Sequence, residues 1–387
     1  MSLRFDVTAP GDIRFGAGRA GELPAAVGAL GVTRALVVTG RSPSRAARAR
    51  AGLEDAGIAA VTFPVPGEPT VDLVRDAVEV VRATGCDGVV GFGGGSALDV
   101  AKAVAILAPT GADPLDHLEV VGRGLPLTVP GLPCVAVPTT AGTGSEVTRN
   151  AVLAARGVKA SLRSPLMLPR VAIVDPDLLA GQPAATVAAS GADALAQLVE
   201  PFLSHRATPF TDALARDGTV RSARSLRRAV AQGLDDPAVR EDLAVASLFG
   251  GLCLDNAGLG VVHGIAGVVG GRFDAPHGAV CAALLAPAVD VTVRALAERH
   301  PTHPAAARAA ELGALLTGVA GAGAADAVAW LVELQTALAV PGLAAHGVTD
   351  ADVPALVEGA RRASSTRAHP IDLTDGELTE ILVRALR

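Results

Sequence analysis

Tyrosine is absent from the 387-residue sequence, and lysine is nearly absent, since Lys102 and Lys159 are the only lysines among 33 basic residues. The lack of tyrosine excludes every mechanism with a tyrosine acid or base, including the Tyr/Lys pair of many short-chain reductases. Because the chain otherwise uses arginine, the two lysines indicate positions that need a compact ammonium group rather than a planar fork. Both are therefore candidate functional residues.

Cysteine is also scarce, and the four cysteines lie far apart with no CxxC pair. This spacing indicates neither a zinc ribbon nor a disulfide framework, and it suits a reducing cytoplasm. The first residues contain no apolar run behind a basic start, so we expect no secretory signal. The sequence therefore predicts a cytoplasmic protein.

Blocks of like charge and long apolar runs are missing as well. The net charge is −6 and residues of both signs are interspersed, which argues against nucleic acid as a partner. The stretch from Asn256 to Gly271 has no formal charge but is shorter than the ~20 apolar residues that a membrane span needs. We expect it to form a buried helix, and we expect no membrane partner.

What is present is a hydrophobic chain, with 50% apolar and 19% charged residues, long enough for two domains. In its N-terminal half, short apolar runs alternate with helical stretches, which indicates βαβ units and a mostly parallel sheet with helices on both faces. The expected strands are Asp12–Phe15 (weak), Ala35–Thr39, Ala59–Pro64, Gly88–Phe92, Cys134–Val137 and Val171–Val174, and the expected helices are Ser44–Ala56, Thr70–Thr84 and Ala97–Leu107.

From about Pro183 onward the alternation stops, and long stretches at helical spacing predict an all-helical region. We therefore expect an α/β domain over residues 1–180 and an all-α domain over residues 181–387. Prolines are expected to interrupt the helices at Pro201, Pro209, Pro276, Pro304 and Pro341.

Three glycine-rich segments are candidates for binding a diphosphate. Gly16-Ala-Gly18-Arg-Ala-Gly21 matches GxGxxG, but a weak strand precedes it and no carboxylate follows about 20 residues later, so we interpret it as a plain turn. Gly93-Gly-Gly-Ser96 directly follows a buried strand and opens a helix, where backbone N–H groups and the helix dipole favour an anion. Asp99, in the first turn of that helix, can accept hydrogen bonds from a ribose or from loop donors.

The third segment, Pro138-Thr-Thr-Ala-Gly-Thr-Gly-Ser-Glu146, also follows a buried strand. Its hydroxyls could bind phosphate or frame a nicotinamide ring. Loops that follow successive parallel strands meet at the carboxyl edge of the sheet, where a doubly wound fold binds its ligand. We therefore expect this loop and the 93–96 loop to lie together.

The motifs that follow these strands resemble those of the iron-containing (group III) alcohol dehydrogenases, in order and spacing, from Phe15 to about Pro287. They read Gly93-Gly-Gly-Ser-Ala-Leu-Asp-Val-Ala-Lys102, Pro138-Thr-Thr-Ala-Gly-Thr-Gly-Ser-Glu-Val-Thr148, Asp175-Pro-Asp177, Gly191-Ala-Asp-Ala-Leu195 and Pro276-His-Gly278. The resemblance implies a Rossmann-like dinucleotide-binding domain followed by a helical metal and substrate domain. It also implies interconversion of a small alcohol with an aldehyde or ketone, and a homodimer.

The resemblance further implies a nicotinamide cofactor, NAD or NADP, and a divalent metal, iron or zinc. By position, the cofactor-binding residues of the family correspond to Gly94, Gly95, Ser96, Asp99, Thr139, Thr140, Thr143 and Lys159. Where members of the family that prefer NAD carry an aspartate, this chain has Gly40, followed by Arg41 and Ser42. A small residue beside arginine accommodates a 2′-phosphate, so we expect a slight preference for NADP.

The metal ligands of the family are an Asp and a His at i and i+4, followed by two more His. The corresponding residues here are Asp193, Gln197, His263 and His277. A glutamine offers only a neutral amide oxygen in place of an imidazole, so we expect a weakened site, although Asp193, His263 and His277 remain the expected catalytic residues. A further histidine that many members carry, four residues after the first downstream ligand, is Gly267 here, so water or a ribose hydroxyl would have to relay the proton.

These departures leave two alternatives open. One is a metal-independent enzyme like the maleylacetate reductases, for which Arg149 and Arg163 are the basic residues near the second loop that could bind a dicarboxylate. The other is a non-catalytic dinucleotide sensor, for which Gln197 and Gly267 would be signs of lost chemistry.

Overall fold

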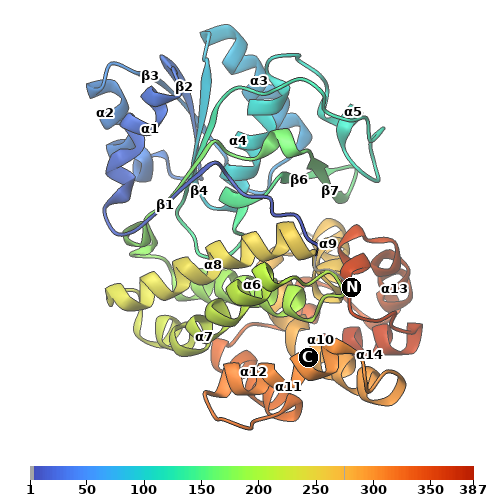
Figure 1. Cartoon of the computed structure of the whole chain (residues 1–387). Helices are drawn as coiled ribbons and strands as arrows, with labels where there is room; N and C mark the ends of the chain where they lie inside the picture. The colour runs from blue at the N-terminus through green and yellow to red at the C-terminus, as the bar shows by residue number, and fades with distance from the viewer. Residues whose placement is uncertain (1–3, 274) are drawn as a thin grey trace. The chain divides into compact units, whose positions relative to one another are not determined.

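The computed structural model describes residues 4–273 and 275–387 (Figure 1). The chain forms two compact units. The first is Ala9–Ala180, and the second is Gly181–Arg387 together with the N-terminal segment up to Thr8.

The first unit is built on a six-stranded sheet in the order β1-β8-β5-β4-β2-β3, in which every neighbouring pair is parallel. The strands are β1 (Asp12–Phe15), β2 (Arg34–Thr39), β3 (Ala59–Pro64), β4 (Gly88–Gly93), β5 (Cys134–Pro138) and β8 (Val171–Val174). The accompanying helices are α1 (Leu23–Ala29), α2 (Ala47–Asp55), α3 (Val71–Thr84), α4 (Gly95–Leu107) and the short α5 (Pro114–His117).

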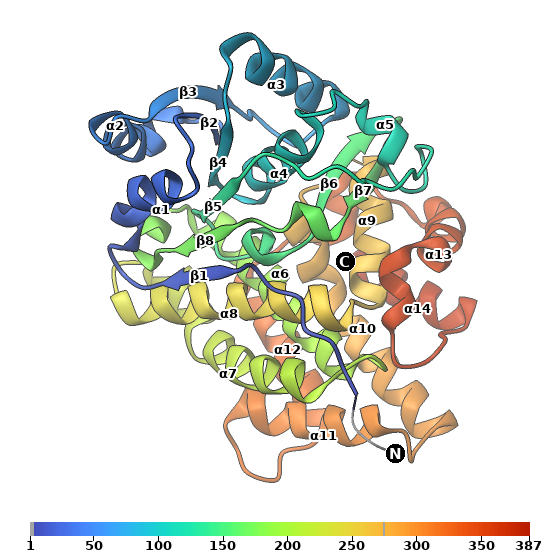
Figure 2. The same ribbon diagram turned by 45° about the horizontal axis from the view of Figure 1, so that its top comes forward.

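Helices cover both faces of this sheet (Figure 2). Successive side chains of a strand point to opposite faces, and β2 shows the result. Val37 packs in a core with residues of α1 and α2, whereas Leu36 and Val38 pack in a second core with residues of α3 and α4. The predicted parallel sheet with helices on both faces is confirmed.

An antiparallel hairpin, β6 (Asn150–Ala155) with β7 (Val158–Arg163), was not expected from the sequence. The turn between its strands is Arg156-Gly157, and both residues have positive φ, 53° and 74°. Such two-residue turns favour Asn-Gly or Asp-Gly, and Arg-Gly does not carry that signal. The turn residues therefore did not predict this hairpin.

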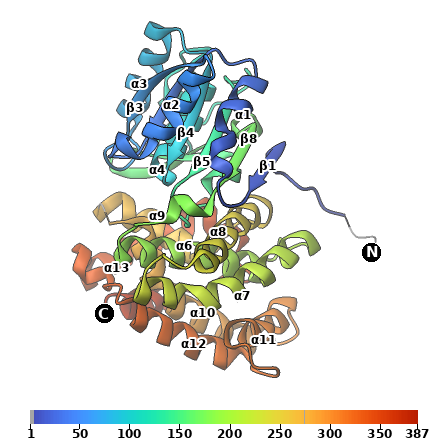
Figure 3. The same cartoon turned by 90° about the vertical axis from the view of Figure 1, so that its left-hand side faces the viewer.

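The second unit is helical, as predicted. Its helices are α6 (Ala184–Leu203), α7 (Pro209–Gln232), α8 (Pro237–Ala257), α9 (Val261–Phe273), α10 (His277–Arg299), α11 (Pro304–Thr317), α12 (Ala324–Leu338), α13 (Val353–Arg362) and α14 (Asp375–Ala385). The helices α6, α7 and α8 pack against one another (Figure 3). A core that includes Leu198, Phe202, Ala215 and Ala246 joins them.

Two local predictions in this unit are wrong. Pro201 does not interrupt its helix but lies inside the last turn of α6, where a missing N–H costs a single hydrogen bond. The stretch Asn256–Gly271 is not one helix, because α8 ends at Ala257 and α9 begins at Val261, with a bend of 99° between them. Gly258, which has φ +71°, allows the chain to leave α8.

Within the described residues, one helix, α10, is long and apolar enough to cross a membrane by length and composition alone. In the structure, however, 78% of its most apolar window is buried inside the protein. Burial of that kind is typical of the core helix of a globular unit, which satisfies an apolar sequence without lipid.

A partly buried histidine should make the stability of the helical unit depend on pH. His369 Nε2 lies 3.2 Å from Thr292 Oγ1, and the His369 carbonyl lies 3.0 Å from His205 Nδ1. Burial, which outweighs attraction to Glu200, lowers the pKa of His369 from 6.5 to about 4. The unfolded chain binds this proton near pH 6.5 and the folded chain binds it only near pH 4, so stability is complete above pH 6.5 and falls towards pH 4.

The loss amounts to at most about 3 kcal/mol of the free energy of unfolding. His369→Gln keeps a polar group for Thr292 but does not titrate, so we expect its unfolding free energy to change less between pH 7 and pH 4.5 than that of the wild type. Urea unfolding of both proteins at the two pH values measures the difference, in which other titrating groups cancel. Equal changes in the two proteins would show that His369 is not buried in its neutral form.

Candidate cofactor and metal sites

The predicted diphosphate loop is where the sequence placed it, between β4 and α4. Its first glycine is required by close packing, because a Cβ on Gly93 would lie 2.7 Å from Ala97 Cβ and 3.1 Å from the nitrogen of Gly40. The end of β2 therefore lies directly beside the loop. Ser96 stands in the first turn of α4, where helix N–H groups can bind an anion.

The second loop faces the first across the same sheet edge. Thr139 donates its backbone N–H to the Gly93 carbonyl (2.9 Å). A Cβ on Gly94 would lie 3.2 Å from the Thr140 side chain, and one on Gly95 would lie 2.6 Å from Thr143 Cγ2. The structure thus brings Gly94 and Gly95 against threonines of the second loop, as expected for two loops that lie together.

Two charged residues of α4 hold the second loop in place through hydrogen bonds. Asp99 accepts hydrogen bonds from Ser145 Oγ (2.6 Å) and from the Val152 N–H (2.9 Å). The ammonium of Lys102 is buried and donates to the Ser145 carbonyl (2.8 Å) and to Thr148 Oγ1 (3.0 Å). Asp99 was expected to accept hydrogen bonds from a ribose or from loop donors, and the structure shows the loop donors. Lys102 positions the loop, a role that suits a compact ammonium group.

The other lysine lies on the hairpin. Lys159 Nζ is 3.0 Å from Glu68 Oε2, in the loop between β3 and α3. The hairpin is tied to the same loop, since Ala154 donates its N–H to the Pro69 carbonyl (2.7 Å). Lys159 thus faces an anionic partner of the protein, and its contact with a cofactor stays a prediction.

The segment after β2 leaves room at Gly40. A Cβ on this glycine would meet no described atom within 4 Å, and its φ lies outside the left-handed region. Arg41 Nε donates to the Pro66 carbonyl (2.8 Å), and Arg45 donates to the Leu178 carbonyl (3.2 Å). Both arginines are exposed and keep further N–H donors.

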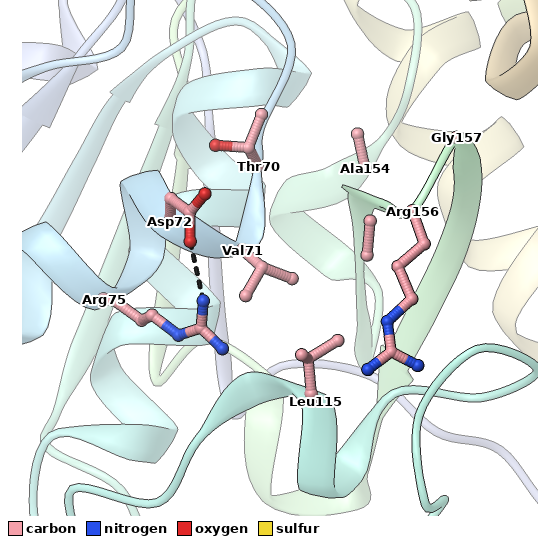
Figure 4. Close-up of a pocket in the computed structure, with 9 residues that line it drawn as sticks. Thr70, Val71, Asp72, Arg75, Leu115, Ala154, Arg156 and Gly157 are labelled. Carbon is pink, nitrogen blue, oxygen red and sulfur yellow. Dashed lines mark hydrogen bonds and ion pairs between the residues drawn. The ribbon is translucent and has the colours of Figure 1, made fainter.

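A shallow pocket of about 350 Å³ also lies in this unit, beside the hairpin turn (Figure 4). It is lined by Thr70, Val71, Asp72, Arg75, Leu115, Ala154, Ala155, Arg156 and Gly157. Arg75 is paired with Asp72 (2.6 Å) and Asp113 (2.7 Å), so its charge is already balanced. None of the residues predicted to bind the cofactor lines this pocket.

Three helices of the second unit bring the predicted metal ligands together. Asp193 lies on α6, His263 on α9 and His277 at the start of α10. The Nε2 atoms of His263 and His277 lie 3.3 and 3.7 Å from Asp193 Oδ1. Asp193 and His263 are buried, whereas 35% of the His277 side chain is exposed, so the cluster can be reached along His277.

Gln197 lies one turn after Asp193 on α6, as its spacing predicts. Its Nε2 donates to Asp193 Oδ2 (3.0 Å). Its Oε1, buried, has no hydrogen-bond partner among the described residues. Gly267, on α9 one turn after His263, leaves open space: a Cβ there would meet no atom within 4 Å in the described part of the chain.

Two residues of this cluster were not predicted from the sequence. Cys281 is fully buried on α10, and its Sγ lies 3.6 Å from Nε2 of His277, four residues earlier. Glu200, also buried, accepts from His263 Nδ1 (2.7 Å) and from the Val262 N–H (2.7 Å). The only sequence signal that could have placed Cys281 in the cluster was its i, i+4 spacing from His277. The only signal for Glu200 was its position on the same predicted helix as Asp193.

The charges of the cluster shift its pKa values in opposite directions. Burial opposes ionisation of Asp193, but the nearby imidazoles of His277 and His263 lower the pKa of its carboxyl below the ordinary value. Burial also opposes protonation of His263, but Cys281 and Asp193 raise the pKa of that imidazole well above its ordinary value. The cluster therefore favours positive charge at its centre, which a divalent cation supplies in place of protons.

The donor set fits a divalent metal. Ligand atoms of Asp193, His263, His277 and Cys281 all lie within 4.8 Å of one another. Asp193 Oδ1 and His263 Nε2 are buried without a hydrogen-bond partner in the described chain, a costly state that a cation relieves. Carboxylate, imidazole and thiolate are the ligands that zinc and iron use in proteins.

Comparison with known families agrees with this geometry over nearly the whole chain. Residues 10–176 match the model of the iron-containing alcohol dehydrogenases, and residues 187–386 match the C-terminal model of the same family. The chain belongs to the iron-containing alcohol dehydrogenase family. As a member, it is an oxidoreductase that interconverts alcohols and aldehydes with NAD(P) and a divalent metal.

Its relatives within the iron-containing alcohol dehydrogenases include a 1,3-propanediol dehydrogenase from Klebsiella pneumoniae, 39% identical over 86% of this chain and 85% of the relative. An NAD-dependent methanol dehydrogenase from Bacillus methanolicus is 34% identical over 92% of this chain and 93% of the relative. A crystal structure of a 1,3-propanediol oxidoreductase superposes with a TM-score of 0.90 at 34% identity, covering 99% of this chain and all (100%) of the other.

Proposed function

We propose that this dehydrogenase oxidises small alcohols, and reduces the corresponding aldehydes or ketones, at the cluster of Asp193, His263 and His277. The observation that carries the proposal is the pair of buried, unpartnered atoms, Asp193 Oδ1 and His263 Nε2, gathered with His277 from three separate helices. Buried polar atoms without a partner are uncommon in folded proteins, and two of them beside a third ligand-type side chain are accounted for by a bound cation. The nicotinamide, when bound, would accept the hydride of the carbinol carbon, and the hydroxyl proton would go to solvent.

The protein's part in this chemistry is to hold ligand atoms in place. A divalent cation, when bound, supplies a Lewis acid that polarises the alcohol oxygen. Asp193, His263 and His277 would hold it, with Gln197 beside them. Because Glu200 accepts the proton of His263 Nδ1, the lone pair of His263 Nε2 stays free for the cation.

For the cofactor, we propose that the two facing loops bind the diphosphate and that NADP is slightly preferred over NAD. The residues concerned are Gly94, Gly95, Ser96, Thr139, Thr140 and Thr143, with Lys159 as a further contact and Gly40, Arg41 and Ser42 beside the ribose. The close packing of Gly93 on Gly40 supports a single site that includes both. The open space at Gly40 supports a larger 2′ substituent.

The metal-independent reductase is a weaker candidate on structural grounds. Of the two arginines that could bind a dicarboxylate, Arg163 already pairs with Glu119 (3.3 Å). The relatives that match most of the chain are alcohol dehydrogenases. These comparisons therefore favour neither a metal-independent reductase nor a non-catalytic sensor.

An activity assay before and after metal removal tests the proposed function. We expect the protein loaded with Zn²⁺ or Fe²⁺ to reduce NAD(P)⁺ with short primary alcohols and diols, followed by absorbance of the reduced nicotinamide. Exhaustive chelation should abolish this activity and re-addition of metal should restore it. Full activity after chelation would favour the metal-independent reductase, and absence of turnover with intact cofactor binding would favour the sensor.

We also propose a cytoplasmic homodimer. All four cysteines are buried free thiols, which suits a reducing compartment. Strand β1 lies at the edge of its sheet with one hydrogen-bonded neighbour in the described part of the chain, so a second copy could pair with it. A solution mass twice that of the chain, by light scattering, would support the dimer.

A further inference from the structure

We propose that Cys281 is the fourth protein ligand of the divalent cation, and that it replaces the imidazole that Gln197 lacks. The inference rests on the proposed metal-dependent function and adds a ligand that the sequence pattern did not assign. It gives this chain a donor set of one carboxylate, two imidazoles and one thiolate.

Position supports this role for Cys281. One turn of α10 separates it from His277, so both side chains lie on the same face of that helix. Its Sγ is 3.6 Å from His277 Nε2 and lies within 4.8 Å of the ligand atoms of Asp193 and His263. These are separations that one cation can span, since bonds to zinc measure about 2.0–2.3 Å on either side of the ion.

The unpartnered atoms around the thiol point to a ligand rather than to ordinary packing. Asp193 and His263 are 2% and 6% exposed, and their free atoms, Oδ1 and Nε2, belong to the same group as the Cys281 sulfur. A structural cysteine normally lies among apolar side chains and is inert. Cys281 instead stands with three residues whose chemistry is that of metal ligands.

Gln197 has a different task in this arrangement. Its amide NH₂ donates to Asp193 Oδ2 and leaves Oδ1 without a hydrogen-bond partner in the described chain. Its Oε1 lies on the side of Gly250 of α8, 3.6 Å from where a Cβ on that glycine would be. Gln197 is thus a positioning residue for Asp193, whereas Cys281 supplies the donor atom.

A thiolate changes the properties of the site. On binding, the thiol proton leaves to solvent and the sulfur carries a full negative charge, so Cys281 and Asp193 together balance a divalent cation. Among divalent ions, thiolate favours zinc, whereas the imidazole that it replaces suits zinc, copper, iron and nickel. We therefore expect the purified protein to retain zinc in preference to ferrous iron.

Cobalt substitution tests the assignment directly, because a thiolate ligand gives Co²⁺ an intense charge-transfer band in the near ultraviolet that oxygen and nitrogen ligands do not give. The chelated full-length protein is titrated with Co²⁺ and its absorbance recorded from the near ultraviolet to the red. We expect one equivalent of Co²⁺ to produce the band in the wild type. In Cys281→Ser we expect the band to disappear and Co²⁺ affinity to fall by at least about 10-fold.

Cys253→Ser is the matched control. Cys253 is equally buried in the helical unit, but its Sγ donates to the Thr211 carbonyl (3.4 Å) and it is not part of the cluster. This variant should keep both the band and the affinity of the wild type. Circular dichroism shows whether Cys281→Ser folds. If it does not, a charge-transfer band that is present in both the wild type and Cys253→Ser still supports Cys281 as the ligand, and its absence from the wild type overturns that role.

The outcomes separate this inference from the proposed function. A wild type that binds Co²⁺ with ligand-field bands but no charge-transfer band would overturn the role of Cys281 and leave the metal-dependent function intact. A band that persists in Cys281→Ser would also overturn it. A wild type that binds no Co²⁺ and turns over alcohol without metal would overturn the proposed function itself.

Discussion

Asp193→Ala is expected to lose bound metal and alcohol turnover together while it remains folded. Asp193 supplies the anionic oxygen around which both imidazoles gather, with 3.3 and 3.7 Å separations. Loss of an outer-shell partner alone costs about 10–100-fold in metal affinity, so removing this ligand should cost more than ~100-fold. Because Lewis-acid stabilisation is worth several kcal/mol, turnover should fall by ~10³-fold or more.

Elemental analysis, zinc titration and initial rates on the same samples measure these effects. Asp212→Asn is a suitable control, since Asp212 is also a buried carboxylate of the helical unit but pairs with Arg308 (2.9 Å) rather than with the cluster. It should keep the wild-type metal content. If Asp193→Ala retained both metal and turnover, the cluster would not be the site of the chemistry.

Gly40→Asp is expected to reverse the cofactor preference. The new carboxylate would stand at the end of β2, beside Gly93 of the diphosphate loop, in space where a Cβ meets no described atom within 4 Å. There it can accept from the 2′-hydroxyl of NADH and repel the 2′-phosphate of NADPH. A hydrogen bond to a charged group contributes about 1.5–3 kcal/mol, so the ratio of the two dissociation constants should change by ~10–100-fold or more.

Fluorescence titration of both proteins with NADH and NADPH gives the two ratios. Gly40→Asn is the matched control, because it adds the same volume without the charge and should retain most of the wild-type preference. A ratio that is the same in the wild type and in Gly40→Asp would mean that another residue reads the 2′ position.

Local features of the fold were visible in the sequence where burial and periodicity agree. Strand β8 lies over Val171–Val174 and β3 over Ala59–Pro64, as their apolar and β-branched residues predict. The break between α8 and α9 and the hairpin turn at Arg156-Gly157 were not predicted. A glycine such as Gly258 or Gly157 allows positive φ but does not by itself show where the chain turns, and the positive φ of Arg156 depends on the tertiary structure.

Some residues of the candidate site could likewise be predicted from the sequence, and others could not. Asp193 and His277 were predicted because they stand in motifs that resemble the family's, and His263 because it matches the family's ligand pattern. Gly94 and Gly95 were predicted from a glycine loop between a strand and a helix. Glu200 and Cys281 stand in no such motif. Their relation to the cluster depends on how α6, α9 and α10 cross, which is a matter of packing.

The sequence by itself determined the class of fold, the family and the positions of the facing loops, because strand periodicity, glycine placement and motif order are local properties of the chain. The tertiary structure alone decided which atoms meet: that Glu200 holds His263, that Gln197 turns its NH₂ to Asp193, and that Cys281 joins the cluster. The physical reason is that side chains distant along the chain meet only after helices pack, and their donors and acceptors are then satisfied by whichever partner lies within reach.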